Sequence, residues 1–190
     1  MKISAESLKN HSGFTLVELL VVFAIISALV SVAIPTFSVW LPNYRLKSAA
    51  MDLYSNFQLT KMKAVRANRD FGIVFDFANG SYQIVDYGSN GTYDAGTDAV
   101  EKTVNYSNYD TNGSIGYGKG YATFSATETP GTIPSDFISF NGNNVALTPQ
   151  GTADKNGYVY IGNIKGRAYA IGMLTSGIIK LKKWTGSAWE

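Results

Sequence analysis

The chain has 190 residues, of which 45% are hydrophobic and 16% charged, and its formal net charge is +2. This length allows one modest domain besides a membrane segment, and the absence of cysteine excludes a disulfide framework, a cysteine nucleophile and thiolate metal ligands. The only histidine, His11, precedes the first apolar segment, so the rest of the chain lacks a histidine base or metal ligand, and we expect no enzyme.

A long apolar segment near the N-terminus contains one acidic residue. Residues 14–34 are almost entirely apolar, and about 20 helical residues span the roughly 30 Å hydrocarbon core of a bilayer. Glu18 is the exception, because an ionised carboxylate that faces lipid is costly. We therefore expect a transmembrane helix over residues 14–40, with a positive charge close to Glu18 in the final assembly.

The residues around Glu18 resemble a prepilin-type signal. Gly13 stands before the cleavage point, Phe14 follows it, and Glu18 takes the fifth mature position, with Thr15 and Leu16 also matching. The resemblance implies that prepilin peptidase removes residues 1–13 as a leader and that the new amino group of Phe14 is methylated. That amino group would supply the positive charge for Glu18, in the same chain or in a neighbour.

Two other interpretations of the apolar segment remain. It could be an ordinary secretory signal cleaved after residues 31–33 (S-V-A), or a single-span anchor that is never cleaved. Glu18 and an apolar run longer than the usual h-region of about 7–15 residues both count against the secretory signal.

The orientation in the membrane follows from basic residues before the span. Lys2 and Lys9 precede it, and the positive-inside rule keeps such a segment in the cytoplasm. We therefore expect a single-pass protein of the bacterial inner membrane whose C-terminal domain lies in the periplasm.

The helical pattern continues beyond the span as an amphipathic helix over residues 41–69. Pro35 and Pro42 each remove a backbone donor and are expected to bend the helix or loosen a turn, and Trp40 with Tyr44 suits the membrane interface. An apolar stripe is predicted to pack on a sheet, and it consists of Leu46, Ala50, Leu53, Phe57, Lys61 and Ala64. The opposite, polar side carries Arg45, Lys47, Asp52, Lys63 and Arg66.

From residue 70 onward, alternating apolar residues and glycine turns predict an antiparallel β-domain. Residues 71–77 and 81–86 form a hairpin around a two-residue Asn-Gly turn at 79–80. An irregular insertion over about residues 87–134 has strand-like pieces at 102–106 and 121–125. Five more strands are predicted at 137–140, 145–148, 158–161, 168–173 and 178–184.

The order of these pieces resembles the GspH/FimT group of minor pilins and type II secretion pseudopilins. The likeness is carried by a helix ending K-M-K-A-V-R-A-N-R, the strand F-G-I-V-F, and F-I-S-F-N-G followed by A-L-T-P-Q-G-T. It implies an α+β fold, in which a long N-terminal helix packs on an antiparallel β-sheet or sandwich of residues 70–190. It also implies a structural subunit that joins other pilins or pseudopilins in a helical filament of a type IV pilus or a type II secretion pseudopilus.

The acidic stretch over residues 86–101 has two interpretations. Oxygen ligands spaced around glycines resemble a calcium loop, and the candidates are Asp86, Asn90, Asp94 and Asp98. The EF-hand spacing fails, because Gly88 occupies the third position and Thr97 the twelfth. A solvated acidic turn without metal is the alternative, and it leaves the chain without a cofactor.

A basic region with one aromatic residue lies near the C-terminus and consists of Lys165, Arg167, Lys180, Lys182, Lys183 and Trp184. Some FimT-like proteins bind DNA for uptake, and phosphate contacts with aromatic stacking suit that function. The arginines of the family's Gly-Arg-x-Arg motif are absent here, where residues 177–180 read G-I-I-K. The alternation of lysine and leucine over residues 180–182 is also typical of an edge strand. A DNA-binding minor pilin is thus the alternative function.

Overall fold

The structure is a computed structural model that describes residues 13–88, 90–110 and 112–190. The chain divides into two compact units, Met1–Ser38 and Val39–Glu190. A single helix, α1 (Leu16–Ala67), begins in the first unit and ends in the second. Apart from Gly13, the predicted leader lies outside the described residues.

The start of α1 is capped by its own sequence. The backbone amide of Glu18 donates to Thr15 Oγ1 over 3.2 Å, which satisfies one of the free donors of the first turn. Thr15 and Glu18 also have the spacing of a capping box. The helix is continuous through Pro35 and Pro42, so neither proline ends it.

The end of α1 follows from a change of backbone conformation at Asn68. This residue takes a left-handed φ of 52°, which asparagine tolerates better than most side chains. The amide of Arg69 then donates to the carbonyl oxygen of Ala64 over 3.3 Å, as in a Schellman motif. The chain leaves the helix there and enters the first strand.

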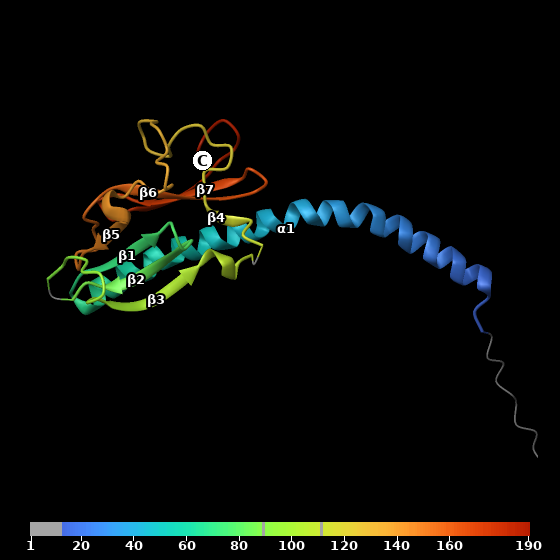
Figure 1. The fold of residues 1–190 in the computed structure, drawn as a ribbon, viewed down its shortest axis with the longest axis horizontal. Coiled ribbons are helices and arrows are strands. Elements are labelled where there is room, and N and C mark those ends of the chain that lie inside the picture. The colour runs from blue at the N-terminus through green and yellow to red at the C-terminus, as the bar shows by residue number, and fades with distance from the viewer. Residues whose placement is uncertain (1–12, 89, 111) are drawn as a thin grey trace, which may run out of the picture. The chain divides into compact units, whose positions relative to one another are not determined.

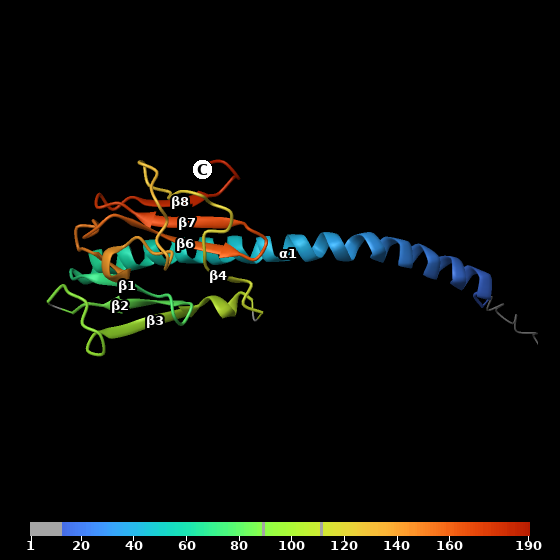
Figure 2. The same cartoon turned by 45° about the horizontal axis from the view of Figure 1, so that its top comes forward.

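The second unit contains two antiparallel sheets that lie along the last part of α1 (Figures 1 and 2). One has the strand order β3-β2-β1-β5 and the other β4-β6-β7-β8. The strands are β1 (Phe71–Asp76), β2 (Ser81–Asp86), β3 (Ala99–Asn105), β4 (Ile115–Tyr117), β5 (Asn144–Leu147), β6 (Gly157–Asn163), β7 (Ala168–Met173) and β8 (Ile179–Lys183), and the short 3-10 helices are η1 (Tyr106–Asn108) and η2 (Asn141–Asn143). This is the predicted α+β architecture.

Both sheets share one hydrophobic core with α1. Phe57 of α1, Phe75 of β1 and Phe140 meet there with ring centroids 5.7 to 6.2 Å apart. The apolar members of the predicted stripe are all buried, namely Leu46, Ala50, Leu53, Phe57 and Ala64. Lys61 lies at the edge of this stripe, where its ammonium donates to the carbonyl oxygen of Gly177 over 2.9 Å.

The polar side predicted for α1 is only partly a solvent face. Asp52 accepts a hydrogen bond from the hydroxyl of Tyr109, and Arg45 forms a 2.9 Å ion pair with Asp110. Periodicity alone places these residues opposite the core. They find partners because loops of the β-domain cover α1 from more than one side.

The hairpin and the strand positions of the first sheet were largely predicted correctly. The connection between β1 and β2 has four residues rather than two, because Asp76 pairs with Ser81 at its base. Within the loop, the carboxylate of Asp76 accepts from the backbone and side-chain amides of Asn79 at 3.0 and 2.6 Å. The predicted piece at 102–106 corresponds to β3, which begins three residues earlier.

Two strand predictions were wrong. Residues 121–125 and 137–140 form no strand, although Ile138 makes an isolated antiparallel bridge with Val159 of β6. Phe137 has a left-handed φ of 61° that interrupts an extended chain. Residues 122–133 instead help to cover the outer face of the second sheet, where Ala122, Ala126 and Ile133 are buried. The three-residue β4 was missed, since so short a strand has no clear alternation in a glycine-rich segment.

Candidate functional site

The three residues of the predicted processing signal lie at the exposed start of α1. Gly13 and Phe14 precede the helix, and the Phe14 side chain is 79% exposed. Glu18 lies in the first turn, where the helix dipole favours a negative charge. No side chain among the described residues forms an ion pair with its carboxylate.

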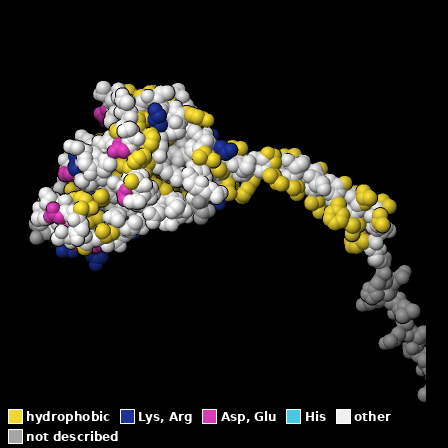
Figure 3. All heavy atoms as spheres, in the orientation of Figure 1, with side chains coloured by type: hydrophobic (Ala, Val, Ile, Leu, Met, Phe, Trp, Pro, Cys, Tyr) yellow, Lys and Arg dark blue, Asp and Glu magenta, His cyan; other side chains and the backbone are white. Residues whose placement is uncertain are grey.

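The described residues of the first unit present an exposed apolar surface. Of the described helices, α1 is long and apolar enough to cross a membrane, and none of its most apolar window is buried. Figure 3 shows hydrophobic side chains along this stretch. Its large exposed members on α1 are Leu16, Val17, Leu19, Leu20, Val21, Val22, Phe23, Ile25, Ile26, Leu29, Val30, Val32, Ile34 and Phe37. Such a surface needs lipid or other helices to cover it.

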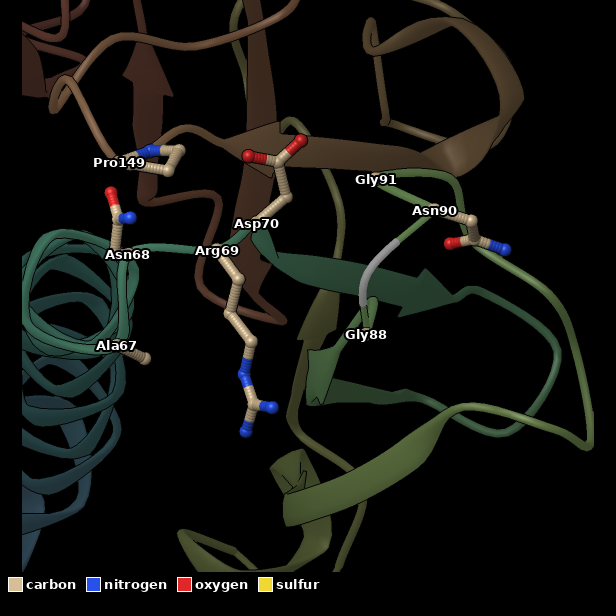
Figure 4. Close-up of a pocket in the computed structure, with 8 residues that line it drawn as sticks. All are labelled: Ala67, Asn68, Arg69, Asp70, Gly88, Asn90, Gly91 and Pro149. Atoms are coloured by element: carbon tan, nitrogen blue, oxygen red, sulfur yellow. The ribbon is translucent and has the colours of Figure 1, made fainter.

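A pocket of about 440 Å³ lies where α1 meets the first sheet. It is lined by Ala67, Asn68, Arg69, Asp70, Gly88, Asn90, Gly91 and Pro149 (Figure 4). Arg69 and Asp70 point in opposite directions in this view. Arg69 pairs with Asp86 at 2.5 Å, whereas burial, with a smaller contribution from the charge of Asp154, raises the pKa of Asp70.

The four candidate calcium ligands are only partly brought together. Asn90 donates to Asp94 Oδ2 at 2.6 Å, and the backbone amide of Asp94 donates to Asp98 Oδ2 at 2.7 Å. Asp86 is instead held by Arg69. Within residues 13–88, 90–110 and 112–190, no group of three or more acidic or histidine side chains is arranged to hold a metal. Calcium binding remains a prediction.

The six candidate DNA-binding residues divide between surfaces of the second sheet. Lys180 pairs with Glu128 at 3.2 Å, and Lys182 donates to the carbonyl oxygen of Ala126 at 2.8 Å. Both lysines therefore hold the loop of residues 122–133 that covers the second sheet. Trp184 is 5% exposed and packs edge-on against Phe124, which leaves it no free face for stacking on a base. Lys165 lies in the turn between β6 and β7. DNA binding remains a prediction.

The other two members, Arg167 and Lys183, line a second pocket with residues of α1. This basic-aromatic pocket has a volume of about 370 Å³ and is formed by Trp40, Asn43, Tyr44, Lys47, Arg167, Tyr169 and Lys183. The sequence assigned Trp40 and Tyr44 to the membrane interface. It did not indicate that they lie beside Arg167 and Lys183, which come much later in the chain. The pairing of Tyr169 with Lys183 across β7 and β8 creates this neighbourhood.

Comparisons with known proteins agree with this architecture. A family model described as a prokaryotic N-terminal methylation motif matches residues 8–34, and one described as type II transport protein GspH matches residues 49–177. The type IV minor pilin FimU of Pseudomonas aeruginosa has a similar structure, with 15% identity, a TM-score of 0.50, and coverage of 78% of this chain and 94% of that chain. This likeness concerns the fold alone.

A second solved structure is that of the minor pseudopilin EpsH from the type 2 secretion system of Vibrio cholerae. It has 13% identity and a TM-score of 0.44, and the match covers 72% of this chain and 95% of that chain. A search of curated proteins gave no match.

Proposed function

The chain belongs to the GspH family of minor pilins and pseudopilins, and from this membership we propose that it is a structural subunit of a helical filament. The filament is a type IV pilus or a type II secretion pseudopilus. Its subunits are held together through their N-terminal helices, while the β-domains form the outer surface. The protein catalyses no reaction in this function.

Maturation begins with removal of the leader. Prepilin peptidase cleaves between Gly13 and Phe14, and the new amino group of Phe14 is methylated. The match of the methylation motif to residues 8–34 supports this step. The exposed position of Phe14 ahead of the helix supports it as well, because a peptidase needs an accessible, non-helical bond.

Before assembly the subunit is held in the bacterial inner membrane. The exposed apolar part of α1 spans the bilayer once. The basic residues Lys2 and Lys9 keep the leader in the cytoplasm, so the β-domain lies in the periplasm.

Assembly transfers this apolar surface from lipid to neighbouring helices. The observation that carries the proposal is the combination of an uncovered apolar helix with one carboxylate, Glu18, inside it. A carboxylate without a partner is costly in such surroundings. The amino group of Phe14 in an adjacent subunit neutralises it and fixes the axial position of each new subunit.

Replacement of Glu18 by glutamine tests the proposal, because it removes the charge and retains the shape. We expect the variant to be cleaved normally. Its recovery in sheared filaments should be about one tenth of the wild-type amount or less, because the buried amino group of Phe14 then lacks its partner charge. Glu128→Gln, which changes a carboxylate on the surface of the β-domain, is the matched control. Equal recovery of both variants would refute the charge-pair account.

A further inference from the structure

The basic-aromatic pocket combines positive charge with an aromatic wall. Trp40, Tyr44 and Lys47 come from α1, whereas Arg167 and Lys183 come from the second sheet. A 2.9 Å hydrogen bond from Asn163 Nδ2 to Asn43 Oδ1 joins the helix to the sheet beside it. The walls of the pocket are therefore held in place by the fold of the second unit.

The cations of this pocket are not neutralised. No acidic residue lines it, and among the described residues no carboxylate lies within ion-pair distance of Lys47, Arg167 or Lys183. Elsewhere in the described part of the unit, five basic side chains have an acidic partner, such as Arg45 with Asp110 at 2.9 Å. Three unpaired cations around one cavity favour an anionic ligand, and an arginine fork with lysines suits a phosphate group.

The aromatic wall indicates where that anion is found. The rings of Trp40 and Tyr44 stack with centroids 5.1 Å apart, and both side chains are more than half exposed. Trp40 is the last residue of the predicted transmembrane segment, residues 14–40, and Tyr44 follows one helical turn later. Tryptophan and tyrosine at the end of a span settle among lipid headgroups.

We propose that the basic-aromatic pocket binds the phosphate of an anionic phospholipid headgroup while α1 is in the membrane. The inference rests on the membrane insertion in the proposed function and adds a specific lipid site to it. Because the three cations line one cavity, a single phosphate group can contact them together. DNA is the poorer ligand, because a long polyanion needs an extended basic track, and two of the three remaining candidate lysines, Lys180 and Lys182, are engaged with the loop of residues 122–133.

The test uses the full chain, reconstituted into phosphatidylcholine vesicles that contain a trace of phosphatidylglycerol with a photoactivatable headgroup. Flotation confirms insertion, and mass spectrometry maps crosslinked peptides. We expect crosslinks in the peptides that contain residues 40–47, 167–169 and 183. Each basic residue near an anionic surface strengthens attraction about fivefold. Lys47→Gln/Arg167→Gln/Lys183→Gln should therefore lower the crosslink yield at least about tenfold.

The matched control is Arg66→Gln/Lys119→Gln/Lys165→Gln, which removes the same charge from exposed positions outside the pocket. It should retain the wild-type yield within about twofold. Unlabelled phosphatidylglycerol should compete, whereas inorganic phosphate and a DNA oligonucleotide should not. Equal losses in both triple variants, or competition by the oligonucleotide alone, would overturn the lipid site. Failure of the wild-type chain to float would overturn membrane insertion and the lipid site together.

Discussion

Asn56 of α1 donates its side-chain amide to the hydroxyl of Tyr82 on β2 over 2.6 Å, in the interior of the β-domain. The same side chain accepts from Lys102 on β3 at 3.0 Å. Burial, with a smaller contribution from Asp52, raises the pKa of Tyr82, so its hydroxyl stays protonated. This hydrogen bond therefore fixes the position of α1 against the first sheet. An apolar contact at the same place would leave the position of the helix less defined.

Removal of the Tyr82 hydroxyl should destabilise the domain. Tyr82→Phe takes the acceptor away from a buried amide, which costs about 1–3 kcal/mol. Urea unfolding of the full chain in detergent micelles, followed by tryptophan fluorescence, measures the loss. Tyr121→Phe, at a side chain that is 74% exposed, should change the unfolding free energy by less than about 0.5 kcal/mol. Equal effects of the two changes would contradict the role of the Asn56 contact.

A methyl group at Gly172 should disturb the second sheet. A Cβ there would lie 2.3 Å from the carbonyl oxygen of Gly157 and 2.4 Å from the ring of Tyr158. Gly172→Ala should therefore destabilise by about 1–3 kcal/mol. Gly116→Ala on β4, where a Cβ meets nothing within 4 Å, is the control and should be neutral or slightly stabilising. Thermal unfolding of the two variants, side by side, gives the comparison.

Asp70 should reduce stability at neutral pH. Its folded-state pKa is raised by burial and, to a lesser extent, by Asp154, so the folded protein holds that proton more tightly than the unfolded chain. Stability therefore falls as the pH rises from the unfolded value of about 3.9 through the folded value. Asp70→Asn should raise the unfolding free energy at pH 7, with a smaller gain at acidic pH. A loss of stability at pH 7 would contradict this explanation.

Asp76 should behave in the opposite way. Hydrogen bonds from Asn79 lower its folded-state pKa, so its carboxylate contributes stability above the unfolded pKa. That contribution disappears as the pH falls through the folded value. Asp76→Asn should lower the unfolding free energy at pH 7. At a pH below the folded-state pKa of Asp76, the variant and the wild type should have similar unfolding free energies. Denaturant titrations at several pH values show whether the Asp70 and Asp76 variants deviate in opposite directions.

Much of this fold could be predicted from local patterns. The apolar stripe of α1, the glycine turns and the alternation in β1, β6 and β7 each depend on residues close in sequence. The strand prediction at 137–140 failed because Phe137 takes a left-handed conformation that no local signal announced. The length of the β1–β2 loop was missed because the Asp76 carboxylate, rather than the Asn-Gly pair alone, organises it.

The surface sites were less predictable than the fold. Lys180, Lys182 and Lys183 lie within four residues of sequence, yet only Lys183 lines the basic-aromatic pocket. Because side chains alternate along a strand, Lys180 and Lys182 lie on the opposite face from Lys183, where the loop around Ala126 and Glu128 engages them. That loop has no periodicity of its own, so the sequence alone did not indicate which lysines it covers. Glu18, by contrast, was recognisable because a charge within an apolar run is conspicuous.

The proposed maturation of the chain has its most direct test at the N-terminus. Mass spectrometry of the protein, isolated from the membranes and filaments of cells that contain prepilin peptidase, should find a chain that begins at Phe14 and carries a methyl group on its amine. A chain that retains Met1, or one that begins at Ile34 after a secretory cleavage, would contradict it.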